Sequence, residues 1–320
     1  MRISVIVPVR NEAKSVSILL DGLLAQSRPP DEIVVADGGS TDATASIIEQ
    51  YMSRTVPVQL IRAGPALPGR GRNLAARQAS CEWLAFIDAG IRPEKDWLGS
   101  LALRASDEKA DVVYGSYEPV VDTFFKECAA IAYVSPPKKI HGLAMRSHFI
   151  ASTLMRRQVW EQIGGFSEHL RSAEDLLFMR KIDNAGFAIS YEPAAVVHWN
   201  LQPRLWQTFK RFVTYSLNNI RANLWKEWQA PVFKRYAVLL VSALPVLVFG
   251  YKWLLFTLAL WLLMLAARAI VAIWRNRTCY PGGIFKNVVR LLALIPLIAL
   301  LDAATVTGTL QWAVRDKAGL

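Results

Sequence analysis

The chain has 320 residues, 53% of them hydrophobic, and a formal net charge of +11. Residues 197–320 contain 15 of the 37 Lys and Arg but only three of the 26 acidic residues, so this part carries +12 and residues 1–196 carry −1. A basic segment that is also apolar and rich in tryptophan indicates a membrane surface and argues against the solvent-facing basic stripe of a nucleic-acid-binding domain. Cys81, Cys128 and Cys279 are far apart and odd in number, which argues against a disulfide framework or a cysteine metal site.

Short apolar runs alternate with amphipathic stretches in the first part of the chain. We expect strands at residues 3–9, 32–36, 58–61 and 83–87, and helices at 16–24, around 47–51 and from 69 onward. The N-terminus enters the first strand directly, without the charged and apolar regions of a cleaved signal peptide. Strands that alternate with helices at this spacing predict an α/β fold with a Rossmann-like, mostly parallel sheet flanked by helices.

Two aspartates follow predicted strands in the same way. Asp88 comes directly after the apolar run Trp83–Ile87, and Asp37 follows Glu32–Ala36. Ligands of open α/β sheets bind at the carboxyl edge of the strands, where both side chains should lie. An aspartate that merely starts a turn is the alternative for Asp88 alone. Two carboxylates at one edge suit a ribose hydroxyl, a base edge or a metal.

A glycine-bearing turn and two arginines belong to the same edge. The sequence DGGSTD at 37–42 leads from a strand into a helix, which lets a nucleotide approach the backbone and the helix N-terminus. It lacks the spacing of a dinucleotide fingerprint and of a Walker loop. Arg70 and Arg72 lie on a segment that leads to this edge, where guanidinium groups hold diphosphates well. A solvated basic loop is the alternative, more so for Arg70.

Together these motifs resemble the family 2 glycosyltransferases, inverting nucleotide-sugar enzymes with a GT-A fold. The resemblance covers roughly residues 3–200. Each motif is weak alone, but their order and spacing are specific. The motifs are PVRNE at 8–12, DGGSTD at 37–42, GRGRN at 69–73, FIDAG at 86–90, GGF at 164–166, EDLLF at 174–178 and VVH at 196–198.

The resemblance implies roles in binding the nucleotide sugar. Glu12 and Asp37 would hold the base and the ribose, and Asp88 would hold the diphosphate through a divalent cation. The expected binding residues are Pro8, Arg10, Glu12, Asp37, Gly39, Arg72 and Asp88.

The cation, Mg²⁺ or Mn²⁺, is implied with Asp88 and His198 as its protein ligands. A D-x-D element would have a second aspartate where this chain has Gly90, and one carboxylate is a poor site for a hard cation. Either water, the diphosphate and His198 complete the shell, or the dependence on metal is weak. A hydrogen-bonded core histidine is the alternative for His198.

The same resemblance makes residues 112–200 the acceptor half, with Asp175 as catalytic base and Glu174 as a supporting acid. A carboxylate that takes the proton of the attacking hydroxyl contributes ~10²–10⁴ to the rate. The structural alternative is that Ser172 and Asp175 form a helix capping box, although glutamate is usual at the last position.

Beyond residue 200 the pattern becomes helical and apolar. Residues 204–229 combine helical apolar spacing with basic residues and tryptophans, which predicts helix along a membrane surface. A helix packed on the catalytic domain is the alternative. Apolar runs follow at 236–250, 253–273 and 291–314. A span needs ~20 apolar residues, so we expect two or three spans.

Charges in this tail predict its orientation. Basic residues before the first run and after the second place both flanks in the cytoplasm, with a hairpin turning at Tyr251–Lys252. Asp302 lies near the middle of the third run, where a charge costs ~2.5–3.5 kcal/mol on insertion scales. We therefore expect Asp302 to face protein or to be protonated, as a helix-packing residue or, less simply, as a contact to the acceptor.

We predict a GT-A catalytic domain at 1–200, interfacial amphipathic helices at 201–235 and transmembrane helices at 236–320. The predicted protein is anchored in the inner or plasma membrane with its catalytic domain in the cytoplasm. It would transfer a sugar from a UDP- or GDP-sugar to a lipid or polyprenyl-linked acceptor in envelope or exopolysaccharide synthesis. The alternatives are a soluble glycan acceptor, a non-catalytic nucleotide-sugar-binding scaffold and a small transporter; three apolar runs without an internal repeat argue against a transporter.

Overall fold

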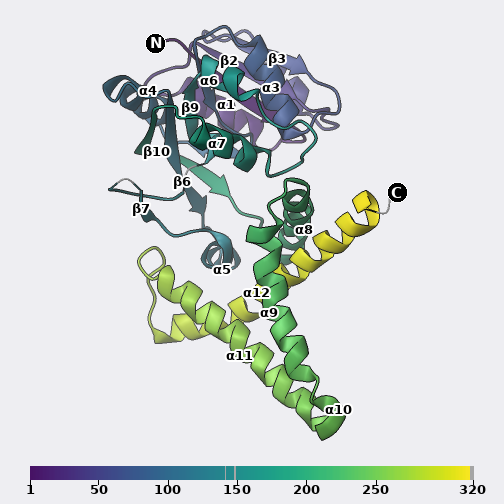
Figure 1. Ribbon diagram of the computed structural model, residues 1–320. Helices are drawn as coiled ribbons and strands as arrows, with labels where there is room; N and C mark the ends of the chain where they lie inside the picture. Colours follow the sequence, from purple (N-terminus) through teal and green to yellow (C-terminus); the bar gives the residue numbers. More distant parts are fainter. Residues whose placement is uncertain (141, 148, 318–320) are drawn as a thin grey trace. The chain divides into compact units, whose positions relative to one another are not determined.

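The computed structural model describes residues 1–140, 142–147 and 149–317 (Figure 1). The chain forms two compact units, one of Met1–Val120 with Pro137–Asn200 and one of Val121–Pro136 with Leu201–Leu320. The main part of the second unit begins at Leu201, directly after the predicted catalytic domain of residues 1–200. The second unit also includes Val121–Pro136, which lies within that predicted domain.

The first unit is built on an eight-stranded sheet. Its strands are β1 Ile3–Val9, β2 Glu32–Asp37, β3 Val58–Arg62, β4 Trp83–Phe86, β5 Ile91–Pro93, β6 Val112–Val120, β9 Thr153–Arg156 and β10 Ile189–Asn200. Their order is β3-β2-β1-β4-β9-β6-β10-β5. The first four strands pair in parallel, as do β6 and β10, whereas β9 and β5 run antiparallel to their neighbours. The predicted α/β fold with a mostly parallel sheet is confirmed.

A separate two-stranded pair and six helices complete this unit. The pair is β7 Lys138–Ile140 with β8 Leu143–Met145. The helices are α1 Val16–Leu24, α2 Thr44–Glu49, α3 Pro68–Gln78, α4 Trp97–Asp107, α6 Arg157–Ile163 and α7 Glu174–Asn184. β2 and β4 are buried along their whole length, which is why their sequences are nearly continuous apolar runs rather than alternating ones.

One buried cluster fixes the helices that carry the GRGRN and EDLLF motifs onto the sheet. It joins Ile6, Val34 and Phe86 of three neighbouring strands to Ala75 of α3 and Phe178 of α7. In Figure 1, α3 and α7 lie beside each other over the strands. The cluster thus packs α3 and α7 onto these strands.

The second unit is helical. Its helices are α5 Phe124–Tyr133, α8 Leu205–Arg221, α9 Trp225–Ala243, α10 Val246–Phe249, α11 Lys252–Arg275 and α12 Ile284–Trp312. Three segments are long and apolar enough to cross a membrane, namely Trp225–Phe249, Lys252–Arg275 and Ile284–Asp316. The predicted helical stretch 204–229 is two helices, because the chain breaks at Asn223, whose φ is +58°.

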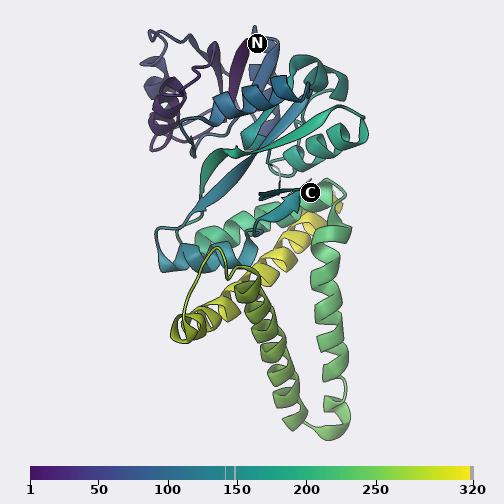
Figure 2. The same cartoon turned by 90° about the vertical axis from the view of Figure 1, so that its left-hand side faces the viewer.

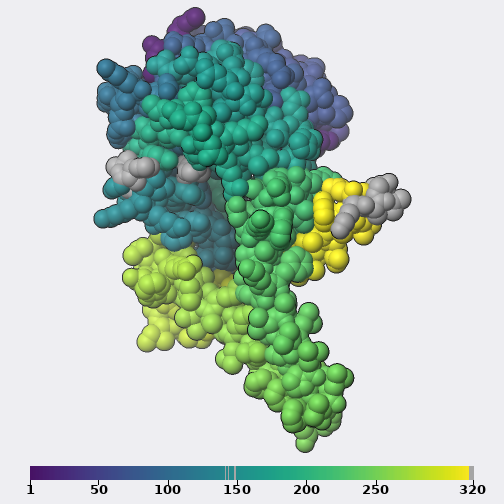
Figure 3. Space-filling model, viewed as in Figure 1, coloured from purple at the N-terminus to yellow at the C-terminus, as the bar shows by residue number. Residues whose placement is uncertain are grey.

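The helices α9 and α11 form the predicted hairpin, which Figure 2 shows at its lower end. Gly250, with φ +72°, makes the turn just before Tyr251. Large apolar side chains at this end are uncovered, among them Leu244, Leu247 and Phe249. The green atoms of α9 and α10 in Figure 3 belong to this uncovered end. The other end of the hairpin packs on protein.

A mixed apolar and ionic contact explains why residues 121–136 belong to the helical unit. Cys128 and Ile131 of α5 are buried with Leu265 of α11 and Leu294 of α12. Beside them, Arg290 Nε of α12 donates to Glu127 Oε1 at 2.6 Å, and Lys286 Nζ lies 3.1 Å from Glu127 Oε2. Partial burial would raise the pKa of Glu127, but these two cations lower it. The first apolar residues after β6 are thus held by α11 and α12.

Candidate active site

The two loops that follow β1 and β2 are joined by hydrogen bonds. Asn11 Oδ1 accepts from Thr41 N at 2.8 Å, and Ser40 Oγ accepts from Asn11 N at 2.9 Å. Thr44 Oγ1 accepts from Glu12 N at 2.8 Å. Asn11 holds this position with φ +55°, a conformation that asparagine tolerates better than most residues. The PVRNE and DGGSTD motifs therefore form one continuous piece of structure.

Asp37 lies at the base of this piece. It is the last residue of β2, is 4% exposed, and accepts a hydrogen bond from Ser40 N at 3.0 Å through Oδ1. Gly39 has φ +79°, and a Cβ there would stand 3.1 Å from Gly64 O, so the turn requires glycine. Asp37 thus both shapes the turn and stands at the carboxyl edge of the sheet, as predicted.

Pro8 and Arg10 of the PVRNE motif, which are also predicted to bind the donor, differ in their surroundings. Pro8 is half-buried, and a Cβ added to Gly71 would lie 3.2 Å from its Cβ, so α3 approaches β1 closely here. Arg10 is exposed, and its side chain has no bonded partner among the described residues. Arg10 therefore remains free to meet an anionic ligand, whereas Pro8 acts through packing.

Arg72 is the centre of the site. Its side chain is 3% exposed; Nη2 donates to Asp88 Oδ1 at 2.7 Å, and Nη1 donates to Glu174 Oε1 at 2.7 Å. The guanidinium also lies over the ring of Phe166, 5.3 Å from its centroid. One arginine thus links the GRGRN, FIDAG, GGF and EDLLF motifs, which are far apart in the sequence.

Asn73, next to Arg72, fixes α3 to the GGF segment. Its Nδ2 donates to Phe166 O at 2.9 Å, while its Oδ1 accepts from Phe166 N at 2.9 Å and from Trp160 Nε1 at 3.2 Å. On the same helix, a Cβ at Gly69 would stand 2.2 Å from Ser167 O. Only glycine permits that approach, so the spacing of GRGRN is set by packing as well as by charge.

The ionic cluster shifts the protonation of its members. Burial raises the pKa of both Glu174 and Asp175, and the positive charge of Arg72 opposes this rise. Burial alone would lower the pKa of Arg72, but Asp88, Glu174 and Asp175 more than offset it and raise that pKa. Three carboxylates around one guanidinium leave a surplus of negative charge, so one carboxylate holds a proton more readily than an exposed acid.

Asp175 is not part of a capping box. The helix α7 begins at Glu174 with Ala173 as its N-cap, in a left-handed conformation and without a side-chain cap. The hydroxyl of Ser172 is buried and has no hydrogen-bond partner within the described part of the chain. Asp175 Oδ1 accepts from Leu176 N at 2.9 Å, and the residue is partly exposed. The capping-box alternative is therefore wrong, and the role of Asp175 as base stays a prediction.

The residues predicted to hold a cation do not form a ready site. His198 of β10 lies 3.1 Å from Glu94 Oε1 through Nε2, and Asp88 is paired with Arg72. In residues 1–140, 142–147 and 149–317, no three His, Cys, Asp or Glu side chains come together in a metal-binding group. A hard cation prefers about six oxygen ligands, so these residues alone do not complete a site for one.

Glu12 has a position that the sequence reasoning missed. Gly90 has φ +83°, and a Cβ built there would lie 3.4 Å from the Glu12 carboxylate. Glu12 Oε2 also accepts from the hydroxyl of Ser15. Glu12 therefore stands beside the position where a D-x-D element would supply its second carboxylate. The unusual glycine at 90 was the available signal, but which carboxylate adjoins it depends on how the loops fold.

Comparison with known proteins gives consistent matches. A family model described as "Glycosyl transferase family 2" matches residues 4–169, slightly more than half of the chain. The poly(ribitol-phosphate) beta-N-acetylglucosaminyltransferase TarS of Staphylococcus aureus is 31% identical over 189 residues, which are 57% of this chain and 32% of that protein. The O-antigen chain rhamnosyltransferase RfbN of Salmonella typhimurium is 27% identical over 225 residues, 66% of this chain and 70% of that one.

A solved structure resembles the whole chain. The mannosyltransferase PcManGT of Pyrobaculum calidifontis, determined in complex with GDP-Man and Mn²⁺, matches with a TM-score of 0.58 and 20% identity over 99% of this chain and 88% of that one. At this identity the likeness concerns the fold. Among the sequence relatives, the chain spans only about a third of the length of TarS.

Proposed function

Because the chain belongs to glycosyl transferase family 2, as its motifs predict, we propose that it transfers a sugar from a nucleoside diphosphate to a hydroxyl acceptor with inversion. The donor would be a UDP- or GDP-sugar. The relatives named above act, by their names, on poly(ribitol-phosphate) and O-antigen chains, and PcManGT was solved with GDP-Man. These matches support a nucleotide sugar as donor and an envelope glycan or glycolipid as product.

The observation that carries the proposal is the buried cluster around Arg72. It holds Asp88 at the sheet edge and Glu174 at the start of α7 on one guanidinium, and Asp175 adjoins them with a raised pKa. In our proposal, Asp175 takes the proton of the acceptor hydroxyl while the diphosphate leaves from the opposite side of the sugar carbon. Glu174 supports this by holding Arg72 in place.

The donor would bind along the joined loops. Glu12, Asp37 and Gly39 would contact the nucleoside, Pro8 would support the loop, and Arg10 would meet the phosphates as an exposed cation. Arg72 was expected to bind the diphosphate directly. Both of its Nη atoms are engaged with carboxylates, so we now assign it mainly to positioning Asp88 and Glu174. A direct contact would require the Asp88 pair to open.

The proposed mechanism does not depend on a divalent cation, and the need for one is tested separately. The family resemblance implies Mg²⁺ or Mn²⁺ with Asp88 and His198, but the described residues do not form a fitting site, and we route no step through a metal. If a cation acts, the donor diphosphate must bring most of its ligands. Transfer measured with and without EDTA, and with added Mn²⁺, distinguishes these two cases.

We further propose that the helical unit anchors the enzyme in a cytoplasmic-facing position on the inner or plasma membrane and that the acceptor is a lipid or a lipid-linked glycan. Three helices are long and apolar enough to span, which supports two or three spans. A polyprenyl or lipid acceptor cannot leave the bilayer, so an anchored catalyst meets it readily. Tryptophans and basic residues on α8 and early α9 support interfacial contact.

The test begins with the purified full chain in detergent and a panel of nucleotide sugars. A bound donor should raise the apparent melting temperature, and the best donor should then be hydrolysed slowly or transferred to added acceptor. Stabilisation without hydrolysis or transfer to any acceptor would favour the non-catalytic scaffold.

A second arm compares acceptors. Transfer to a polyprenyl-linked acceptor is expected to exceed transfer to the same glycan without its lipid. Equal rates on both would contradict the lipid acceptor and leave the soluble glycan as substrate.

A further inference from the structure

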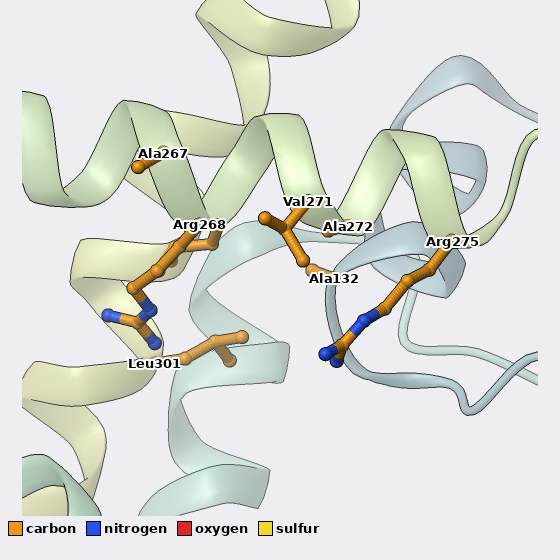
Figure 4. Close-up of a pocket in the computed structure, with 8 residues that line it drawn as sticks. Ala132, Ala267, Arg268, Val271, Ala272, Arg275 and Leu301 are labelled. Carbon is orange, nitrogen blue, oxygen red and sulfur yellow. The ribbon is translucent and has the colours of Figure 1, made fainter.

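The helical unit contains a cavity of about 450 Å³ between α5, α11 and α12. Ala132, Val271 and Leu301 form apolar walls, and Arg268 and Arg275 supply two cations. Figure 4 shows both guanidinium groups on the same side of α11, at either end of a gap that contains Val271 and Leu301. The described lining has neither an acidic nor an aromatic side chain. Such a cavity suits an apolar chain that carries an anionic group.

The two arginines are not equally occupied. Arg268 is paired with Asp302, with Nη2 donating to Oδ1 at 3.1 Å and Nη1 bonded to Oδ2. Arg235 Nη2 lies 3.4 Å from the same carboxylate, so this group keeps one positive charge in excess. Arg275 is exposed and has no bonded partner among the described residues. The cavity is therefore bordered by positive charge that its own acid does not neutralise.

Other cations near the end of α11 and the start of α12 are already engaged. Arg290 and Lys286 are paired with Glu127. Arg277 stacks on the ring of Trp274 at 4.5 Å and donates from Nη1 to Trp274 O at 2.9 Å. Arg275 is thus the cation of this region that stands free at the cavity, which points to it as the anion contact.

The position along α11 indicates what kind of anion would arrive. Arg275 is the last residue of a candidate span, next to Trp274, and a tryptophan beside an arginine at a span end is typical of the membrane interface. Arg268 lies seven residues earlier, ~10 Å deeper along the helix at 1.5 Å per residue. A headgroup phosphate at Arg275 would let an acyl chain run along the alanine and leucine walls.

We propose that this cavity binds an anionic glycerophospholipid of the bilayer, with its phosphate on Arg275. Charge complementarity selects the anionic class, because the lining offers cations and no group that would hold a choline or ethanolamine. Phosphate bound to a free guanidinium forms a charge-assisted, bidentate contact. The bound lipid would fill the gap between α5, α11 and α12 and hold these helices together. The inference rests on the membrane placement within the proposed function, but not on sugar transfer.

The test is native mass spectrometry of the full chain released from detergent after equilibration with phosphatidylglycerol or phosphatidylcholine of the same acyl chains. We expect a retained phosphatidylglycerol adduct and at least about tenfold weaker retention of phosphatidylcholine. Arg275→Gln should weaken phosphatidylglycerol binding about tenfold, because one charge-assisted contact is lost. Arg277→Gln is the matched control, and it should bind like the unaltered chain because Arg277 points to Trp274.

A second variant separates charge from shape. Ala267→Trp keeps both arginines but places bulk at the cavity, so it should also reduce the adduct. Equal binding of the two phospholipids, or an Arg275→Gln variant that binds like the unaltered chain, would overturn the proposal. So would a polyprenyl phosphate that displaces phosphatidylglycerol at a small fraction of its concentration, since the site would then belong to an acceptor.

Failure of this inference and failure of the proposed function give different results. A chain that inserts into vesicles and transfers sugar, yet does not discriminate between the two phospholipids, contradicts the lipid site alone. A chain that does not associate with vesicles at all contradicts the membrane anchor and the lipid site together. Loss of donor binding, by contrast, contradicts the proposed chemistry and leaves the lipid measurement unaffected.

Discussion

The ionic cluster around Arg72 in the first unit and the one around Asp302 in the second unit have opposite signs. In the first unit a buried arginine, Arg72, lies between the carboxylates of Asp88 and Glu174, and Asp175 adds a further negative charge nearby. In the second unit a buried carboxylate, Asp302, lies between Arg268 and Arg235. The first cluster therefore has surplus negative charge and the second surplus positive charge.

The central group is buried in both clusters, but the groups around it differ in how far protein covers their side chains. Glu174 is buried with its partner Arg72, and its Oε2 has no hydrogen-bond partner among the described residues. Arg268 and Arg235 are covered less by protein, with 30% and 32% of their side chains exposed. In the first cluster Arg72 and Glu174 are buried together, whereas Asp88 and Asp175 are partly exposed and can meet a ligand. In the second cluster the arginines mainly neutralise Asp302 within a candidate span, which suits helix packing. The excess positive charge of this cluster can still attract an anionic ligand.

The largest expected effect follows from replacing the proposed base. Asp175→Asn should lower the transfer rate by ~10²–10⁴ while donor binding remains nearly unchanged, because the amide keeps the shape but cannot take the proton. Transfer rate and donor-induced thermal stabilisation, measured on the same preparation, check this. The matched control is Asp183→Asn, an exposed acid on the same helix, which should leave both values unchanged. Equal loss of transfer and donor binding would count against the catalytic role.

The next effect concerns the buried arginine of the first cluster. Arg72→Met removes the cation that pairs with buried Glu174 and with partly exposed Asp88. Glu174 is then left uncompensated, which typically costs about 3–5 kcal/mol. We expect a marked fall in the melting temperature of the detergent-solubilised full chain. Arg77→Met, on the exposed side of the same helix, is the control and should change the melting temperature little.

A double variant sharpens the interpretation of this loss. Arg72→Met with Glu174→Leu removes both the cation and the acid that would be stranded, so part of the lost stability should return. If the double variant is less stable than Arg72→Met by the full cost of Glu174→Leu alone, the two side chains are not coupled. The positioning role that we assign to Arg72 would then be wrong.

Acid should inhibit transfer through the first cluster. Burial raises the pKa of Asp175 and Glu174, so these carboxylates take up protons at a higher pH than exposed acids do. The base acts only when deprotonated, and kcat/KM should therefore fall as the pH falls through the raised pKa, about tenfold per pH unit below it. The apparent value belongs to the coupled pair.

The same shift predicts a stability effect with a defined sign. A carboxyl group whose pKa is higher in the folded than in the unfolded state favours folding at low pH and loses that contribution as the pH rises through the folded value. His198→Gln serves as the control for the rate profile, because it removes the imidazole of the predicted metal ligand and leaves the groups around Arg72 in place. An acid limb that disappears in His198→Gln would assign the profile to the histidine.

Much of this organisation was predictable from local sequence patterns. The strands up to residue 87 are mostly apolar runs, and the structure has them within one residue of the predicted limits. The hairpin at Gly250 and the three apolar helices likewise follow from composition and length. Such features depend on neighbours in the chain, so a single sequence contains the required information.

What the sequence could not provide is pairing between distant residues. Arg72 and Glu174 are separated by 102 positions, and nothing in either motif indicates that one buries the other. The position of Glu12 beside Gly90 could not be predicted for the same reason. Nor could the bond between Glu127 and Arg290, which holds residues 121–136 on α12. The break at Asn223 was missed for another reason: apolar spacing continues across it, and only the positive φ interrupts the helix.

The smallest expected effect concerns the second cluster, and it tests the contrast most directly. Asp302→Asn removes the acid but keeps an oxygen that Arg268 can bond, and neither arginine is enclosed by protein. Polar contacts between membrane helices contribute on average about 0.6 kcal/mol and at most about 1.7, so we expect a loss within that range. Thermal unfolding of the full chain, run beside Arg72→Met, provides the comparison. If Asp302→Asn destabilises the chain as strongly as Arg72→Met, exposure of the partner arginines does not relieve the lost pair, and both clusters must be regarded as structural centres.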